Sequence, residues 1–265
     1  IKNGKNMGTI KLIICKNENE ISDLASKIIV DLVNNKKKSN LGLATGSSPI
    51  GTYKKIIEKY NNCEVCLKHV RTFNLDEYLD LKKDDFKNSY EYYMAENLFS
   101  KTDIRKKRTF FPTMLGNKPN DNYSKFEDKI KKYGKIDIQL LGLGTNGHIG
   151  FNEPGSAIDT RTRIVDLAQS TIDSNSRYFK SKEDVPKRAV SMGLGTILEA
   201  EKILLIAFGK EKSEAIKNFF TKEEFHDDLP MSALWNHKNV YIIIDEQAAS
   251  KINKDKLSNF LIENE

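Results

Sequence analysis

Several polar side chains follow a glycine-rich segment near the middle of the chain. Four of them can form hydrogen bonds or transfer protons, and they lie within eight residues of one another: Asn146, His148, Asn152 and Glu153. The apolar run before them, residues 136–143, is typical of a buried strand in a parallel sheet. Because ligands bind at the carboxyl ends of such strands, we predict a ligand or reaction site at this point.

Two carboxylates follow another predicted strand. Residues 69–75 run directly into Asp76 and Glu77. Acidic side chains at a strand end are unfavourable unless they are solvated, cap the next element or take part in chemistry. The pattern leaves a capping role and a functional role for this pair equally open.

A loop rich in hydroxyl groups joins a short apolar strand, 41–44, to a helix predicted at 52–60. The loop consists of Thr45, Gly46, Ser47, Ser48 and Pro49. Proline suits the first position of a helix, and the free N–H groups at a helix N-terminus bind anions such as phosphate. A plain capped turn explains the same residues equally well. The loop is not a P-loop, because the GxxxxGK[ST] spacing and its lysine are absent.

Positive side chains are available for such a phosphate. Lys212 lies just beyond the predicted strand 202–208, and Arg177 lies in an irregular segment. Taken alone, Lys212 is more simply explained as a solvated lysine. Together, however, a phosphate loop, the carboxylate of Asp76 and the imidazole of His148 fit proton-transfer chemistry on a sugar phosphate.

Two other motifs point to different chemistry. Residues 142–147 match GxGxxG, and Asp166 follows at a distance suited to a ribose contact. The dinucleotide fingerprint opens a helix, whereas a glycine and a proline follow here, so we reject a nicotinamide site. Cys63 and Cys66 form a CxxC, but a zinc site would need two more ligands, and a redox role is the weaker interpretation.

Strands and helices alternate along the chain, with about seven predicted strands. This alternation predicts an α/β fold in three α/β/α layers, with a mostly parallel, doubly wound sheet. We expect one domain over residues 9–265, with residues 1–8 as an N-terminal extension. Residues 155–187 form a lid-like excursion, after which residues 190–194 return as a strand of the sheet.

The composition does not indicate a membrane or nucleic-acid-binding protein. Hydrophobic residues make up 38% and charged residues 30%, and the formal net charge is +6. Lysine is spread along the chain, and the basic cluster at 105–108 has no nucleic-acid motif around it, so we expect no nucleic-acid partner. There is no apolar run of about twenty residues and no signal peptide, so we expect no membrane partner and a cytoplasmic location. No metal-ligand spacing is present.

Five stretches resemble the glucosamine-6-phosphate deaminase family: GLATGSSPIGTY, TFNLDEYLDL, GLGTNGHIGFNEPGS, NSRYF and VPKRAVSMGLGTIL. The resemblance runs in register over residues 11–245, and the NGHIGFNEP and TFNLDEY blocks are highly specific. It implies an enzyme that converts glucosamine 6-phosphate and water to fructose 6-phosphate and ammonia, without a metal or organic cofactor. It leaves open whether the protein is a monomer or a homo-oligomer.

The resemblance also implies roles for individual residues. His148, assisted by Glu153 and Asn146, would open the sugar ring. Asp76 would move the C2 proton to C1 through an enolamine. The substrate phosphate would lie against loop and cationic residues: Thr45, Gly46, Ser47, Ser48, Arg177 and Lys212. Some family members carry aspartate where this chain has Asn146. Asparagine can orient His148 but cannot take up a proton.

Regulation is a second point at which this chain departs from the family pattern. Allosteric members bind N-acetylglucosamine 6-phosphate between subunits. Ser156 and Arg163 match that site, but Val165 and Asp166 stand where a lysine and a threonine would bind the phosphate. Because Asp166 would repel a phosphate, we predict no allosteric activation of this type.

Two alternative functions share the scaffold. A 6-phosphogluconolactonase would not need a base aimed at C2, and the sequence contexts of Asp76 and Glu153 argue against it. A sugar-phosphate sensor of a bacterial regulator would need an N-terminal DNA-binding helix pair, which we do not expect from the few residues before the first strand.

Overall fold

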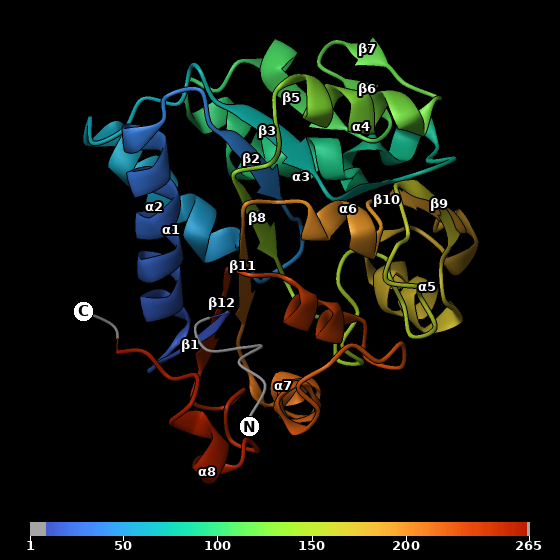
Figure 1. Ribbon diagram of the computed structural model, residues 1–265. Coiled ribbons are helices and arrows are strands. Elements are labelled where there is room, and N and C mark those ends of the chain that lie inside the picture. Colours follow the sequence, from blue (N-terminus) through green and yellow to red (C-terminus); the bar gives the residue numbers. More distant parts are fainter. Residues whose placement is uncertain (1–8, 264–265) are drawn as a thin grey trace.

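The computed structural model describes residues 9–263 and has helices on both faces of a central sheet (Figure 1). The predicted extension, residues 1–8, lies outside the described residues. The strands are β1 Ile10–Cys15, β2 Asn40–Leu43, β3 Arg71–Asn74, β4 Asp76–Tyr78, β5 Thr109–Phe111, β6 Met114–Leu115, β7 Lys118–Pro119, β8 Ile138–Leu141, β9 Arg163–Asp166, β10 Arg188–Ser191, β11 Lys202–Ala207 and β12 Val240–Asp245.

The helices lie between these strands. The α-helices are α1 Glu18–Asn35, α2 Ile50–Asn61, α3 Tyr90–Asn97, α4 Tyr123–Lys132, α5 Gln169–Asn175, α6 Leu194–Leu198, α7 Ser213–Thr221 and α8 Lys254–Leu257. The short 3₁₀ helices are η1 Lys83–Asn88, η2 Phe99–Lys101, η3 Lys106–Arg108, η4 Ser176–Tyr178, η5 Lys182–Asp184, η6 Lys210–Lys212 and η7 Pro230–Asn236. Within residues 9–263, no helix has the length and apolar character needed to cross a membrane.

The main sheet confirms the predicted α/β architecture. Its strand order is β1-β12-β11-β8-β2-β3-β5-β6-β7, and the neighbouring pairs from β1 to β5 are parallel. The hairpin β6–β7, which the sequence did not predict, extends one edge in antiparallel register. Parallel strands end on the same side of a sheet, so the carboxyl ends of β11, β8, β2 and β3 lie side by side.

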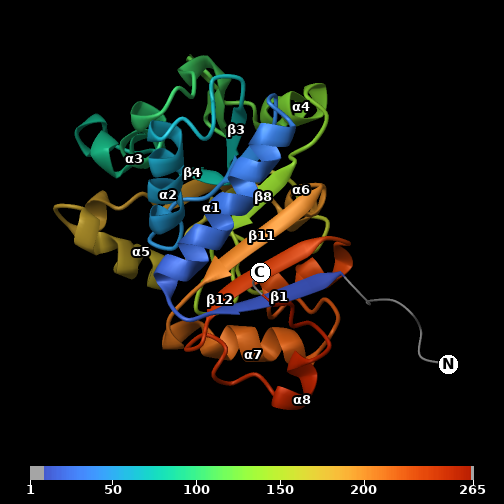
Figure 2. The ribbon, with the colours of Figure 1, turned by 90° about the vertical axis from the view of Figure 1, so that its left-hand side faces the viewer.

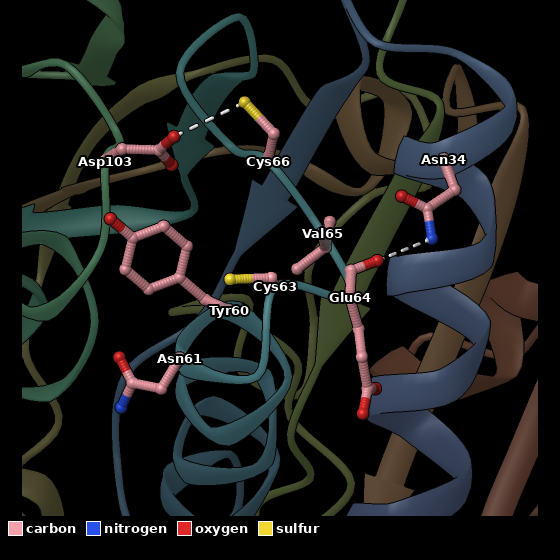
Figure 3. Close-up of a pocket in the computed structure, with 8 residues that line it drawn as sticks. All are labelled: Asn34, Tyr60, Asn61, Cys63, Glu64, Val65, Cys66 and Asp103. Carbon is pink, nitrogen blue, oxygen red and sulfur yellow. Dashed lines mark hydrogen bonds between the residues drawn. The ribbon is translucent and has the colours of Figure 1, made fainter.

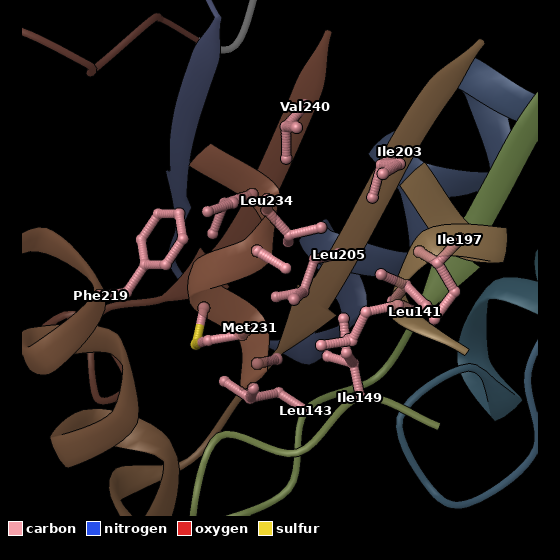
Figure 4. Packing of buried hydrophobic residues seen from close by; sticks show 14 of the residues in the cluster. Leu141, Leu143, Ile149, Ile197, Ile203, Leu205, Phe219, Met231, Leu234 and Val240 are labelled. Carbon is pink, nitrogen blue, oxygen red and sulfur yellow. The ribbon is translucent and has the colours of Figure 1, made fainter. Parts of the chain in front are cut away.

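Both faces of the sheet are buried under helices. Ile203 and Leu205 of β11 face a cluster that includes Phe219 of α7 (Figure 4). Leu204 and Ile206 of the same strand face the opposite cluster, to which α1 and α2 contribute; these two helices lie in front of the sheet in Figure 2. Burying each such side chain contributes about 1.5–3 kcal/mol, which explains why β11 is an unbroken apolar run.

The prediction that residues 190–194 return to the main sheet is wrong. Strand β10 pairs antiparallel with β4 and β9 in a separate three-stranded sheet of order β4-β10-β9. The chain leaves the main sheet at Leu75, whose carbonyl accepts a hydrogen bond from Met192 N at 2.8 Å. A short apolar run indicates burial but does not identify the strand it pairs with. As a consequence Asp76, two residues beyond the end of β3, pairs within the small sheet.

Residues 155–187 consist of short elements next to this small sheet. They contain β9, α5, η4 and η5. The side chain of Asn175 donates to the Tyr78 hydroxyl at 2.7 Å, and the rings of Tyr78 and Phe179 meet edge to face at 6.2 Å between centroids. The segment is therefore held against β4, the strand that carries Asp76.

Candidate active site

The ends of the central strands bring together residues that are far apart in the sequence. Lys212, in η6 after β11, donates through Nζ to the carbonyl of Leu143 at 2.5 Å. A Cβ added at Gly142 would lie 3.7 Å from the Ser48 side chain. The loop after β2, the loop after β8 and the segment after β11 thus meet at one edge of the sheet.

The loop that carries His148 is closed by its own backbone. Gly144 N donates to the carbonyl of His148 and Gly147 N to the carbonyl of Gly144, both at 3.0 Å. Gly147 has φ +83°, a conformation that favours glycine. A Cβ at Gly144 would lie 2.0 Å from Cε1 of His148, so the imidazole ring rests directly on the backbone of Gly144.

Asn146 links His148 to Glu153. Its Oδ1 lies 2.7 Å from Nδ1 of His148 and accepts a hydrogen bond from the backbone N of His148 at 3.1 Å. Its Nδ2 donates to Oε2 of Glu153 at 2.9 Å, whereas Nδ1 of His148 lies 3.7 Å from that oxygen. Because the amide oxygen is an acceptor, Nδ1 of His148 carries the proton and Nε2 is the basic nitrogen.

Partial burial favours the neutral form of His148. Desolvation lowers the pKa of its imidazole, Glu153 opposes this effect, and the positive charge of Lys212 adds to it. A neutral imidazole whose Nε2 can accept a proton is suited to general base chemistry near neutral pH.

Asp76 is a buried carboxyl group with a raised pKa. The residue is 7% exposed, and no hydrogen bond to its side chain is found within residues 9–263. Desolvation, followed by repulsion from Glu77, raises the pKa of Asp76 to about 8. An aspartate with a pKa near neutrality is matched to general acid–base work at physiological pH.

Glu77, in contrast, caps a helix, which is one of the two roles left open for this pair. Its carboxylate accepts hydrogen bonds from the backbone N of Tyr78, Tyr90 and Glu91, each at 2.9 Å. Two of these donors belong to the first turn of α3, where a negative charge is favourable. Burial raises the pKa of Glu77 to about 7, and the three N–H groups oppose the rise.

The loop from residue 45 to 49 has the features of an anion site. Helix α2 begins at Ile50, no side chain caps it, and Pro49 lies at the N-cap position, one residue earlier than predicted. Gly46 has φ +93°, and Gly46 and Ser47 are exposed. An uncapped helix start with free N–H groups binds anions. Tyr53 supports the loop, since its hydroxyl donates to the carbonyl of Ala44 at 2.5 Å.

Arg177 and Lys212 differ in how they relate to this loop. Lys212 lies at the strand ends, and burial lowers the pKa of its ammonium group. Arg177 is exposed in η4, with its guanidinium 4.7 Å from the centre of the Tyr178 ring. Within residues 9–263, no hydrogen bond or ion pair joins Arg177 to the loop.

The other sequence motifs lie outside this arrangement. Residues 142–147 form a turn and do not open a helix, which agrees with the rejection of a dinucleotide site. Cys63 and Cys66 are free thiols that line a cavity of about 630 Å³ at the C-terminal end of α2 (Figure 3). Cys66 Sγ contacts Asp103 at 3.4 Å.

The positions that match the allosteric pattern have local partners. Ser156 Oγ donates to the carbonyl of Glu153 at 2.6 Å, and Arg163 donates to Oδ1 of Asn152 at 2.7 Å. Asp166 is exposed on β9, and Val165 is half-buried beside it. These contacts do not test the prediction about allosteric activation.

Comparison with known proteins places the chain in a family. Residues 18–243 match the family model of glucosamine-6-phosphate isomerases/6-phosphogluconolactonase. Proteins named glucosamine-6-phosphate deaminase are similar: that of Malacoplasma penetrans is 47% identical over 88% of this chain and 97% of its own length, and that of Mycoplasma mycoides 48% over 92% and 98%.

Solved structures agree with the sequence comparison. A monomeric glucosamine-6-phosphate deaminase superposes with a TM-score of 0.84, at 40% identity over 91% of this chain and all of the other. The 6-phosphogluconolactonase of Trypanosoma cruzi, at 22% identity, shares the fold with a TM-score of 0.72 over 95% of this chain and all of the other. The chain therefore belongs to the glucosamine-6-phosphate isomerase/6-phosphogluconolactonase family.

Proposed function

We propose that this protein is a glucosamine-6-phosphate deaminase, which converts glucosamine 6-phosphate and water to fructose 6-phosphate and ammonia. The similar proteins named above carry this activity in their names at 47% and 48% identity. The observation that carries the proposal is the burial of Asp76, whose side chain has no hydrogen bond within residues 9–263, because abstraction of a carbon-bound proton is favoured by a base of raised pKa in a water-poor site.

His148 opens the sugar ring. Its basic Nε2 moves the proton of the anomeric hydroxyl to the ring oxygen, which breaks the C1–O5 bond and leaves an open-chain aldehyde. Asn146 keeps the ring in the required tautomer, and the charge of Glu153 stabilises the imidazolium that forms. Ring opening comes first because the proton on C2 becomes acidic only beside a carbonyl group.

Asp76 then acts on the open chain. Its carboxylate removes the C2 proton to give an enolamine and returns a proton to C1, which moves the carbonyl oxidation level to C2. Water adds to the resulting C2 imine. Ammonia is then expelled from C2, and fructose 6-phosphate remains. Because burial raises the pKa of Asp76 to about 8, its ionised form is a stronger base than a solvated carboxylate.

The phosphate is held by the loop from Thr45 to Ser48 and by Lys212. The open N-terminus of α2 and the ammonium group supply donors and positive charge to a dianion. Arg177 would join them if residues 155–187 act as a lid that closes over the sugar. The hydrogen bond between Asn175 and Tyr78 joins this segment to the strand of Asp76, next to the proposed site.

A lactonase is the second candidate, because the family includes 6-phosphogluconolactonases and several share this fold. Lactone hydrolysis needs no base aimed at C2. The 6-phosphogluconolactonase structures of Trypanosoma cruzi and Leishmania guyanensis are 22% and 20% identical to this chain, whereas the two deaminases named above are 47% and 48% identical.

The decisive assay incubates the protein with glucosamine 6-phosphate, without added metal or cofactor, and measures ammonia and fructose 6-phosphate. Equal release of both products is expected. Folded protein that releases neither product, but hydrolyses 6-phosphogluconolactone, would replace the deaminase proposal by the lactonase one. Folded protein that binds glucosamine 6-phosphate without any turnover would point instead to a sensor.

A further inference from the structure

Helix α3 contacts the proposed site at two points. At its start, the backbone N of Tyr90 and Glu91 donate to the carboxylate of Glu77, the neighbour of Asp76. One turn further along, the hydroxyl of Tyr93 donates to the carbonyl of Gly46 at 2.6 Å. One short helix therefore joins the strand that carries the proposed base to the loop that holds the proposed phosphate.

The first turn of α3 is firmly held. Besides the two bonds to Glu77, Ser89 Oγ accepts from Tyr92 N at 3.0 Å, and Ser89 N donates to the carbonyl of Phe86 at 2.9 Å. All four N–H groups that a helix start leaves without partners thus have acceptors. The ring of Tyr90 also packs against Tyr78, with centroids 4.9 Å apart. A shift of α3 relative to β4 would break these contacts.

The bond from Tyr93 orients a peptide group of the phosphate loop. The carbonyl of Gly46 and the N–H of Ser47 belong to the same trans peptide and point in opposite directions. A carbonyl drawn toward α3 therefore directs the N–H of Ser47 away from α3, into the exposed side of the loop. Tyr53 secures the chain just before the loop, because its hydroxyl accepts from Ala44 N at 3.1 Å and donates to the carbonyl of Ala44 at 2.5 Å.

We propose that Tyr93 is a positioning residue for the phosphate of the substrate, and that α3 sets the distance between this phosphate and Asp76. The inference rests on the proposed function in taking the loop as the site of a sugar phosphate. Tyr93 itself touches only protein, so its effect passes through the backbone of Gly46 and Ser47. Loss of its hydroxyl should weaken binding of the phosphate group and spare the chemistry of His148.

The test compares Tyr93→Phe with Tyr92→Phe. Tyr92 lies on the same helix and packs on Phe86, but its hydroxyl has no hydrogen bond within residues 9–263. In Tyr93→Phe the KM for glucosamine 6-phosphate should rise roughly three- to tenfold with kcat within about twofold, the effect of one lost hydrogen bond. The dissociation constant of inorganic phosphate, from calorimetry, should rise by the same factor. Tyr92→Phe should match the wild type.

Two results would overturn the inference. One is a Tyr93→Phe variant with unchanged KM and unchanged phosphate affinity, and the other is an equal change in Tyr92→Phe. A merely structural role would lower the melting temperature and kcat together, without this selective loss of phosphate binding. If the wild type releases no ammonia, the proposed function fails, whereas the calorimetric comparison with inorganic phosphate still decides the role of Tyr93.

Discussion

The two regions that supply proton-transfer groups are built in opposite ways. The loop from Gly144 to Glu153 surrounds His148 with partners from nearby positions in the sequence, and the histidine stays half-exposed. Strand β4 buries Asp76 beneath segments distant in the sequence and leaves its carboxyl group without a hydrogen bond within the described part of the chain. The first region controls orientation and the second controls basicity.

Burial nevertheless acts on both groups in the same sense. Burial lowers the pKa of His148 and raises that of Asp76, since in each case it disfavours the charged form. Both groups are thereby moved toward their neutral forms. For the histidine this gives a base ready at neutral pH, and for the aspartate it gives a base that is strong when ionised.

Replacing the buried carboxyl group should have the largest effect. Asp76→Asn keeps the size of the side chain but cannot accept the C2 proton, so kcat should fall by about a thousandfold while phosphosugar binding persists. Steady-state rates and calorimetric binding of fructose 6-phosphate measure the two quantities. An Asp76→Asn variant with near-native turnover would mean that another group is the base.

In the wild type, kcat/KM should rise with pH until Asp76 ionises, near pH 8.

A change in the histidine loop should have a smaller effect, through orientation. In Gly144→Ala the new Cβ would meet the imidazole of His148 at 2.0 Å, so the ring must move. We expect kcat to fall by about ten- to a hundredfold, the cost of misplacing a catalytic group by about an ångström. Gly142→Ala is the matched control, because its Cβ would meet Ser48 at an ordinary 3.7 Å. Equal rates in the two variants would contradict the predicted geometry.

The smallest expected effect is on stability, and it depends on pH. The unfolded chain releases the Asp76 proton near the ordinary aspartate pKa of 3.8, whereas burial raises the pKa in the folded chain to about 8. The folded state binds more protons in this window, so the free energy of unfolding decreases as the pH rises through it. Asp76→Asn has no proton to release, so its free energy of unfolding should exceed that of the wild type by on the order of 2 kcal/mol at pH 8 and above.

Urea unfolding at several pH values measures this gain. Near pH 4 the carboxyl group is protonated in the folded state, so the variant and the wild type should there differ little. A gain that is equal at all pH values would show that the substitution acts through packing and not through the buried charge.

Much of the fold could be predicted from periodicity, but strand pairing could not. The apolar runs of β8, β11 and β12 showed that the sheet is buried and parallel. Residues 190–194 are also a short, mostly apolar run, yet residues 188–191 pair antiparallel with β4 in the small sheet. Local side-chain patterns report burial, whereas partners are chosen by how distant segments pack.

The same division applies to the site. The amino-acid order alone places Asn146 and Glu153 within reach of His148, because a glycine-closed loop spans only a few residues. The packing of distant segments gives Asp76 and Glu77 different environments. The carboxylate of Glu77 accepts hydrogen bonds from the start of α3, whereas the buried carboxyl group of Asp76 has no hydrogen bond within residues 9–263. The same packing also places the hydroxyl of Tyr93 on Gly46. Short-range hydrogen bonds follow from spacing along the chain, while burial and contacts between distant segments follow only from packing.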